Sequence, residues 1–117
     1  MSAPKTIKSS SQYGRVYREG RRQAGEKVII YYLETGAGGV IPGFVASRKN
    51  VGNRAVQRNR AKRLLREVFR GVRRRIAAEN IWIVFIASFD PEETSFRDLM
   101  EDVEGSLARA GLIASAE

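Results

Sequence analysis

The chain has 117 residues and a formal net charge of +8, which leaves room for one domain with one modest core. It contains no cysteine and no histidine, which excludes disulfides, thiolate nucleophiles, the usual zinc sites and a histidine general base. Such a basic chain favours nucleic acid or an anionic membrane surface as its partner.

No apolar run approaches the roughly 20 residues that a membrane span needs, and the N-terminus has no secretory signal pattern. We therefore expect a cytoplasmic protein without a membrane segment. Residues 1–8 are rich in small and polar groups and are predicted to form a flexible tail. Residues 9–113 are predicted to form a single α/β domain, followed by a C-terminal tail at residues 114–117.

The first predicted helix follows the three serines at positions 9–11, which can serve as N-caps, and runs to about Glu19. Gly20 would end it. Tyr13 and Tyr17 fall on one face of this helix because they are four residues apart. They are interpreted either as part of the core or as an aromatic platform on which unpaired bases stack.

Two strands are predicted next. Residues 28–33 are β-branched or aromatic almost throughout, and residues 40–47 form a second run with Pro42 near its start, where a missing N–H is tolerated. A glycine-rich stretch at residues 34–39 separates them. This order indicates an antiparallel hairpin.

A long basic helix is predicted from about Ala55 to Ala78. Within residues 48–75, 12 of 28 side chains are Lys or Arg and Glu67 is the only acid. At about 100° per residue the helix separates into two faces. Seven residues share the apolar face: Ala61, Leu64, Leu65, Val68, Phe69, Val72 and Ile76.

The other face of this helix is interpreted either as a solvated surface or as a binding surface for a polyanion. Lys62, Arg66, Arg70 and Arg74 follow one another at i,i+4 spacing, where like charges repel and destabilise the isolated helix. Guanidinium groups also suit bidentate contacts with phosphate. Nucleic acid is therefore the favoured partner.

Residues 81–87 form the most apolar run and are predicted to be a central strand buried on both faces, with Trp82 in the core. A last helix is predicted to open at residues 90–94 and to end at Gly111. Its acids could be read as a metal cluster, but their distribution around the helix favours ordinary solvated residues. The order of elements predicts an α+β fold, a two-layer α/β sandwich.

Residues 55–70, AVQRNRAKRLLREVFR, resemble the signature of the bacterial ribonuclease P protein family. In that family an Arg-Asn-Arg core precedes a Lys-Arg pair, an apolar pair, Arg-Glu and an aromatic residue. Residues 13–20 resemble its opening helix, and residues 44–49 resemble its third strand with the basic pair that follows. Residues 81–87 take the place of its fourth strand, so the resemblance spans roughly residues 9–110.

The resemblance implies a ribosomal protein S5 domain 2-like fold, with a four-stranded sheet, flanking helices and a left-handed crossover into the basic helix. It also implies a function as the protein component of ribonuclease P. In that holoenzyme a catalytic RNA removes the 5′ leader from precursor tRNA by endonucleolytic cleavage, using magnesium held mainly by the RNA. No obligate protein partner, protein-bound metal or catalytic side chain is expected. A chain without His or Cys is consistent with that division of labour.

The resemblance also assigns roles to individual residues. Seven residues of the basic helix would contact the catalytic RNA: Arg58, Asn59, Arg60, Lys62, Arg63, Arg66 and Arg70. Five would contact the leader: Tyr13, Tyr17, Tyr31, Arg48 and Lys49. The alternative interpretation is a general RNA-binding or ribosome-associated module without a role in cleavage. A membrane-surface protein would need a free apolar helix face, which the core is expected to use.

Overall fold

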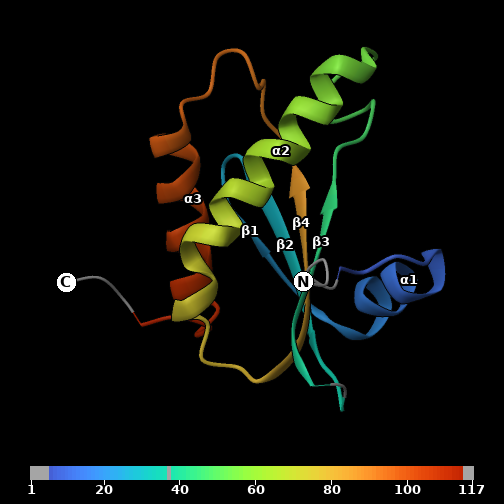
Figure 1. Ribbon diagram of the computed structural model, residues 1–117, viewed down its shortest axis with the longest axis vertical. Helices are drawn as coiled ribbons and strands as arrows, with labels where there is room; N and C mark the ends of the chain where they lie inside the picture. Colours follow the sequence, from blue (N-terminus) through green and yellow to red (C-terminus); the bar gives the residue numbers. More distant parts are fainter. Residues whose placement is uncertain (1–5, 37, 115–117) are drawn as a thin grey trace, which may run out of the picture.

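The chain folds around one mixed sheet (Figure 1). The computed structural model describes residues 6–36 and 38–114. Its helices are α1 (Ser10–Glu19), α2 (Ala55–Val72) and α3 (Phe96–Arg109), with a short 3-10 turn, η1 (Arg73–Arg75). Its strands are β1 (Arg21–Ala24), β2 (Val28–Glu34), β3 (Gly39–Val45) and β4 (Asn80–Ala87). No helix of the described residues has the length and apolarity to cross a membrane.

The strand order is β1-β2-β4-β3, so the predicted hairpin between residues 28–33 and 40–47 is wrong. Strand β4 lies between those two strands, antiparallel to β2 and parallel to β3. Its central position follows from its apolar sequence, since a strand with neighbours on both edges and both faces buries most of its side chains. Phe85 of β4, for example, lies between Ile30 of β2 and Phe44 of β3.

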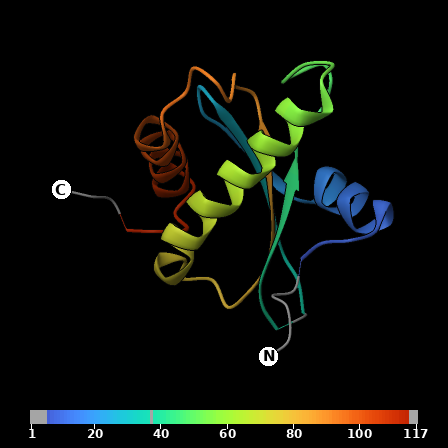
Figure 2. The ribbon, with the colours of Figure 1, turned by 45° about the horizontal axis from the view of Figure 1, so that its top comes forward.

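Helix α2 connects the parallel strands β3 and β4 by a left-handed crossover. In Figure 1 both arrows point upward, β4 lies to the left of β3, and α2 passes in front of the sheet. This is the rare hand for such a connection. Helices α2 and α3 cover one face of the sheet and α1 covers part of the other, as the turned view in Figure 2 also shows. The predicted α+β fold with a four-stranded sheet is confirmed.

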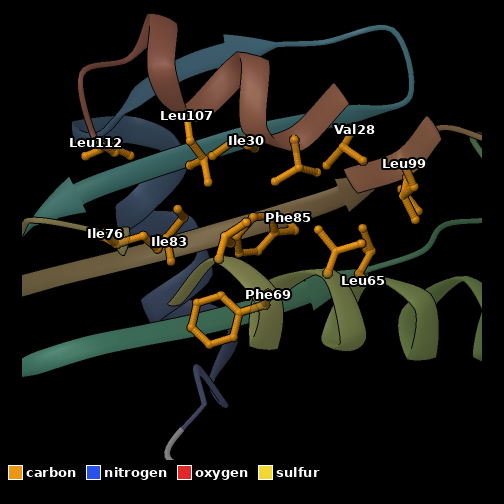
Figure 3. Close-up of a cluster of buried hydrophobic side chains, with 14 of the residues drawn as sticks. Val28, Ile30, Leu65, Phe69, Ile76, Ile83, Phe85, Leu99, Leu107 and Leu112 are labelled. Carbon is orange, nitrogen blue, oxygen red and sulfur yellow. The ribbon is translucent and has the colours of Figure 1, made fainter. Parts of the chain in front are cut away.

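The main core lies between the sheet and helices α2 and α3 (Figure 3). Six of the seven residues of the predicted apolar face of α2 are buried in it, and Leu64 packs against it while partly exposed. Strand β4 contributes Ile81, Ile83 and Phe85 to this side and Val84 to a smaller cluster under α1. The side of β4 that faces α2 and α3 is fully buried, whereas Trp82 and Ile86 on the α1 side are only partly buried. The prediction of burial on both faces, with Trp82 in the core, is therefore confirmed only in part.

Helix α1 begins and ends as predicted. Ser9 is its N-cap, and its side chain and that of Gln12 bond each other's backbone N–H groups in a capping box. A Cβ atom on Gly20 would lie 2.5 Å from the backbone oxygens of Val16 and Tyr32. Close packing of the chain, rather than a positive φ, therefore requires glycine there. The chain then enters β1, a strand whose exposed and polar sequence gives little signal of its own.

Two other helix boundaries differ from the prediction. Helix α2 ends at Val72 and not near Ala78, because Ile76 turns into the core in an extended conformation and begins the path to β4. Helix α3 begins at Phe96 with Ser95 as its N-cap, whereas the predicted opening at residues 90–94 forms a separate turn around Asp90. Phe96, the first residue of α3, is 44% exposed.

The end of the predicted N-terminal tail is packed on the sheet. Residues 1–5 and 115–117 lie outside the described residues. Ile7, however, is buried, and its backbone N–H donates to the carbonyl oxygen of Pro42 at 2.8 Å. The segment at residues 6–8 therefore runs along the free edge of β3 rather than forming part of a loose tail.

Candidate nucleic-acid interface

Helix α2 presents its basic side chains to solvent. Of the seven residues predicted to contact RNA, Asn59, Arg60, Arg63, Arg66 and Arg70 are exposed, and Arg58 and Lys62 are half-buried. The Nη1 atom of Arg58 donates to the carbonyl oxygen of Gly52 at 2.9 Å. Arg58 therefore also fixes the loop that leads into the helix, which has no side-chain cap of its own.

Acidic side chains of the chain neutralise little of this surface. Arg70 forms an exposed ion pair with Glu67, at 3.2 Å, and such surface pairs contribute little to stability. None of the other predicted RNA contacts forms an ion pair within the described part of the chain. Most of the positive charge along α2 is thus left unpaired by acidic side chains of the described residues.

Tyr13, Tyr17 and Tyr31 meet on the α1 side of the sheet, and we call them the tyrosine cluster. The ring centroids of Tyr13 and Tyr17 are 6.3 Å apart, and those of Tyr17 and Tyr31 are 5.0 Å apart in an edge-to-face arrangement. Tyr17 is 39% exposed, whereas Val16 beside it is fully buried. The cluster therefore packs on the core and also offers an aromatic surface to solvent.

The hydroxyls of Tyr13 and Tyr17 stay protonated at neutral pH, because the pKa of each is raised. Burial raises the pKa of Tyr13, although a backbone hydrogen bond from Phe44 and the charge of Arg66 oppose that rise. Burial also raises the pKa of Tyr17, and its two tyrosine neighbours add to the effect. The cluster is consequently a neutral aromatic surface that does not repel a phosphate backbone.

Arg66 connects the tyrosine cluster with the basic face of α2. Its guanidinium carbon lies 5.6 Å from the centroid of the Phe44 ring, and its charge acts on the Tyr13 hydroxyl. Tyr13 lies against the backbone of Gly43, where a Cβ atom would be 2.8 Å from the tyrosine ring. The two predicted sets of residues therefore meet across the free edge of β3.

The remaining predicted leader contacts, Arg48 and Lys49, lie in the exposed turn between β3 and α2. This turn follows the part of β3 that Tyr13 covers. One cation on the same side of the sheet was not predicted: the guanidinium of Arg15 lies 5.5 Å from the Trp82 ring centroid. Nor was the role of Phe44 predicted, because nothing in a strand pattern reveals which helix residue will lie above it.

Comparisons with known proteins show the family to which the chain belongs. The family model described as Ribonuclease P matches residues 1–111. A ribonuclease P protein component from Pelotomaculum thermopropionicum is 36% identical over 104 residues, covering 89% of this chain and 90% of that protein. One from Symbiobacterium thermophilum is 37% identical over 108 residues, covering 92% and 91%.

Solved structures show the same fold. The RNase P protein of Staphylococcus aureus has a TM-score of 0.79 at 24% identity, covering 95% of this chain and 99% of that one. The RNase P protein of Thermotoga maritima has a TM-score of 0.77 at 25% identity, covering 90% and 96%. The chain therefore belongs to the ribonuclease P protein family, as a protein subunit of that endoribonuclease.

Proposed function

We propose that this subunit binds the catalytic RNA of ribonuclease P through α2 and holds the 5′ leader of precursor tRNA on the tyrosine cluster. The observation that carries the proposal is the meeting of an unneutralised arginine face with a neutral aromatic surface at Arg66. Arginines neutralise phosphates and release counterions, whereas aromatic rings accept unpaired bases with little sequence preference. The folded catalytic RNA would be held mainly by the arginines, whereas a single-stranded leader would stack its bases on the aromatic rings.

The protein's part in cleavage would be to bring two polyanions together and to fix the leader. Within the described residues there is no group of three His, Cys, Asp or Glu side chains that could together hold a metal ion. In line with the ribonuclease P family, we assign magnesium to the catalytic RNA, whose phosphates are the ligands that this ion favours. Arg48 and Lys49 would add phosphate contacts beside the leader.

Cleavage of precursor tRNA by the cognate catalytic RNA tests the proposal. At low magnesium concentration the reaction should require the protein, because charge neutralisation by the protein then replaces that by the ion. In the presence of the catalytic RNA the subunit should also favour precursor over mature tRNA, and this preference should weaken as the leader is shortened. Stimulation without leader dependence would instead indicate a general RNA-binding module.

Tyr17 provides a sharper test of the leader contact. Tyr17→Ala should weaken binding of precursor tRNA to the holoenzyme roughly 5- to 150-fold, the range expected for one stacked base. Mature tRNA should bind as before. Tyr17→Phe is the matched control, because it keeps the ring and should keep the affinity. Equal losses for precursor and mature tRNA would show that Tyr17 acts only through the core.

A further inference from the structure

A pocket opens between α2 and the free edge of β3, on the face of the sheet opposite the tyrosine cluster. Its volume is about 320 Å³, which falls in the range of small-molecule sites. It is lined by Thr6, Pro42, Phe44, Phe69 and three arginines of α2 and η1: Arg66, Arg70 and Arg73. None of the predicted leader contacts lines it.

The floor of the pocket is aromatic. Phe69 lies over β3 at the edge of the core farthest from α3 (Figure 3), and its ring centroid is 6.0 Å from that of Phe44. Phe44 stacks on Phe85 with an interplanar angle of 16°, and Phe44 itself remains partly exposed. The Phe44 ring is thus the more open of the two, and Phe69, which is 7% exposed, lines the same pocket beside it.

The rim of the pocket is positively charged. Arg66, Arg70 and Arg73 follow one another at i, i+4 and i+7, so their side chains project from one stripe of the helix. Only Arg70 has an acidic partner in the described part of the chain, the exposed Glu67. Guanidinium groups around an aromatic floor match a nucleotide, whose base is flat and apolar on its faces and whose phosphates are anionic.

We propose that this pocket receives one unpaired nucleotide of the catalytic RNA, with its base on Phe44 and Phe69 and its flanking phosphates on the arginine rim. The rim continues the basic face of α2, to which the proposed function assigns the catalytic RNA, and the inference rests on that assignment. The leader is disfavoured because its proposed site lies across the sheet. The bound base would anchor the RNA at one position, which charge alone does not do.

Titration of the free protein tests whether the pocket accepts a base. Adenosine monophosphate should shift the amide NMR signals of Thr6, Phe44 and Phe69 saturably, whereas inorganic phosphate should shift signals of basic side chains across α2 without that preference. Equal shifts of the three amides by both probes would overturn the inference, because the pocket would then be only a charged rim. This experiment needs neither the catalytic RNA nor precursor tRNA. A negative result would therefore refute the nucleotide pocket without contradicting the proposed function.

Two neighbouring arginines test whether the catalytic RNA uses the pocket. Arg73→Ala and Arg74→Ala remove the same charge from adjacent exposed positions, but only Arg73 lines the pocket. Arg73→Ala should weaken binding of the catalytic RNA about tenfold more than Arg74→Ala, since it also loses the positioned phosphate contact. Equal effects of the two changes would contradict the inference.

Filling the pocket gives a variant that leaves every charge in place. Thr6→Phe should weaken binding of the catalytic RNA at least about fivefold, the lower bound for a stacked base, without changing its salt dependence. Ser10→Phe, at an exposed position of α1 outside the pocket, is the control and should bind normally. A Thr6→Phe protein that melts like the unchanged chain but binds the catalytic RNA equally well would overturn the inference. So would one that loses only the preference for precursor tRNA.

Discussion

At the scale of single residues, Gly43 determines where the tyrosine cluster sits. A Cβ atom there would lie 2.8 Å from the Cε1 and hydroxyl oxygen of Tyr13, and ordinary side chains do not approach so closely. The obstacle is the far end of one side chain, which can swing away. Gly43→Ala should therefore move Tyr13 and reduce precursor-tRNA binding several-fold, while lowering the free energy of unfolding by only about 1 kcal/mol or less.

Gly38→Ala is the matched control for that change. The nearest atom to its added Cβ would be the Asn80 Oδ1, at 4.0 Å, so no side chain has to move. Binding assays with precursor and mature tRNA, together with thermal melting, would separate the two effects. An unaltered precursor affinity in Gly43→Ala would mean that the position of Tyr13 is irrelevant to the leader.

Individual site residues could be predicted from the sequence because they belong to local patterns. The exposure of Arg60, Arg63 and Arg66 follows from helical periodicity together with the apolar residues between them. The approach of Arg66 to Phe44 could not be predicted, because it depends on how a helix crosses a strand about 20 positions earlier in the chain. The pocket beneath the arginine rim has the same origin and left no signal in the sequence.

At the scale of elements, the sequence indicates strands and helices better than their pairing. The predicted hairpin was wrong because residues 28–33 and 40–47 are adjacent in the chain, yet the later strand β4 is the more apolar partner for both. Placing β4 between β2 and β3 buries most of its apolar side chains. That advantage depends on the whole sheet, and local sequence patterns do not reveal it. The left-handed crossover was likewise available only through family resemblance, since general chain statistics favour the opposite hand.

The link between α3 and the β1–β2 turn is a second feature of this scale. The Asp102 carboxylate accepts hydrogen bonds from the backbone N–H groups of Glu26, Lys27 and Val28, at 2.9, 3.0 and 3.0 Å. The carboxylate thereby links the turn between β1 and β2, at the edge of the sheet, to helix α3. A Cβ atom on Gly25 would lie 2.6 Å from this carboxylate, so the turn has no space for a side chain there.

Asp102→Ala should lower the free energy of unfolding by about 2–3 kcal/mol, since backbone donors lose a charged acceptor and Val28 is fully buried. Urea denaturation followed by circular dichroism would measure the change. Glu101→Ala is the control on the same helix. Among the residues that the structure describes, its carboxylate pairs only with the exposed Arg97, so this change should cost about 0.5 kcal/mol or less. Similar losses for the two variants would contradict a special role for Asp102.

At the scale of the whole molecule, positive charge is concentrated on one helix and negative charge on the C-terminal part. Residues 48–75 carry 12 Lys or Arg and one acid, whereas residues 90–117 carry eight acids and two arginines. Arg75 and Glu104 form an ion pair where η1 meets α3. This asymmetry should orient the protein as it approaches RNA, with α2 leading and α3 turned away.

The salt dependence of RNA binding tests this orientation. Arg63→Ala should weaken binding of the catalytic RNA and reduce the slope of log K against log salt concentration by about 0.9, the value for one lost phosphate contact. Arg97→Ala, on α3, removes the same charge from another exposed position and should leave the slope unchanged. If both variants reduced the slope alike, the RNA would respond only to net charge, and α2 would not be a defined interface. A reduction confined to Arg63→Ala would place phosphate on α2 and leave α3 free of RNA.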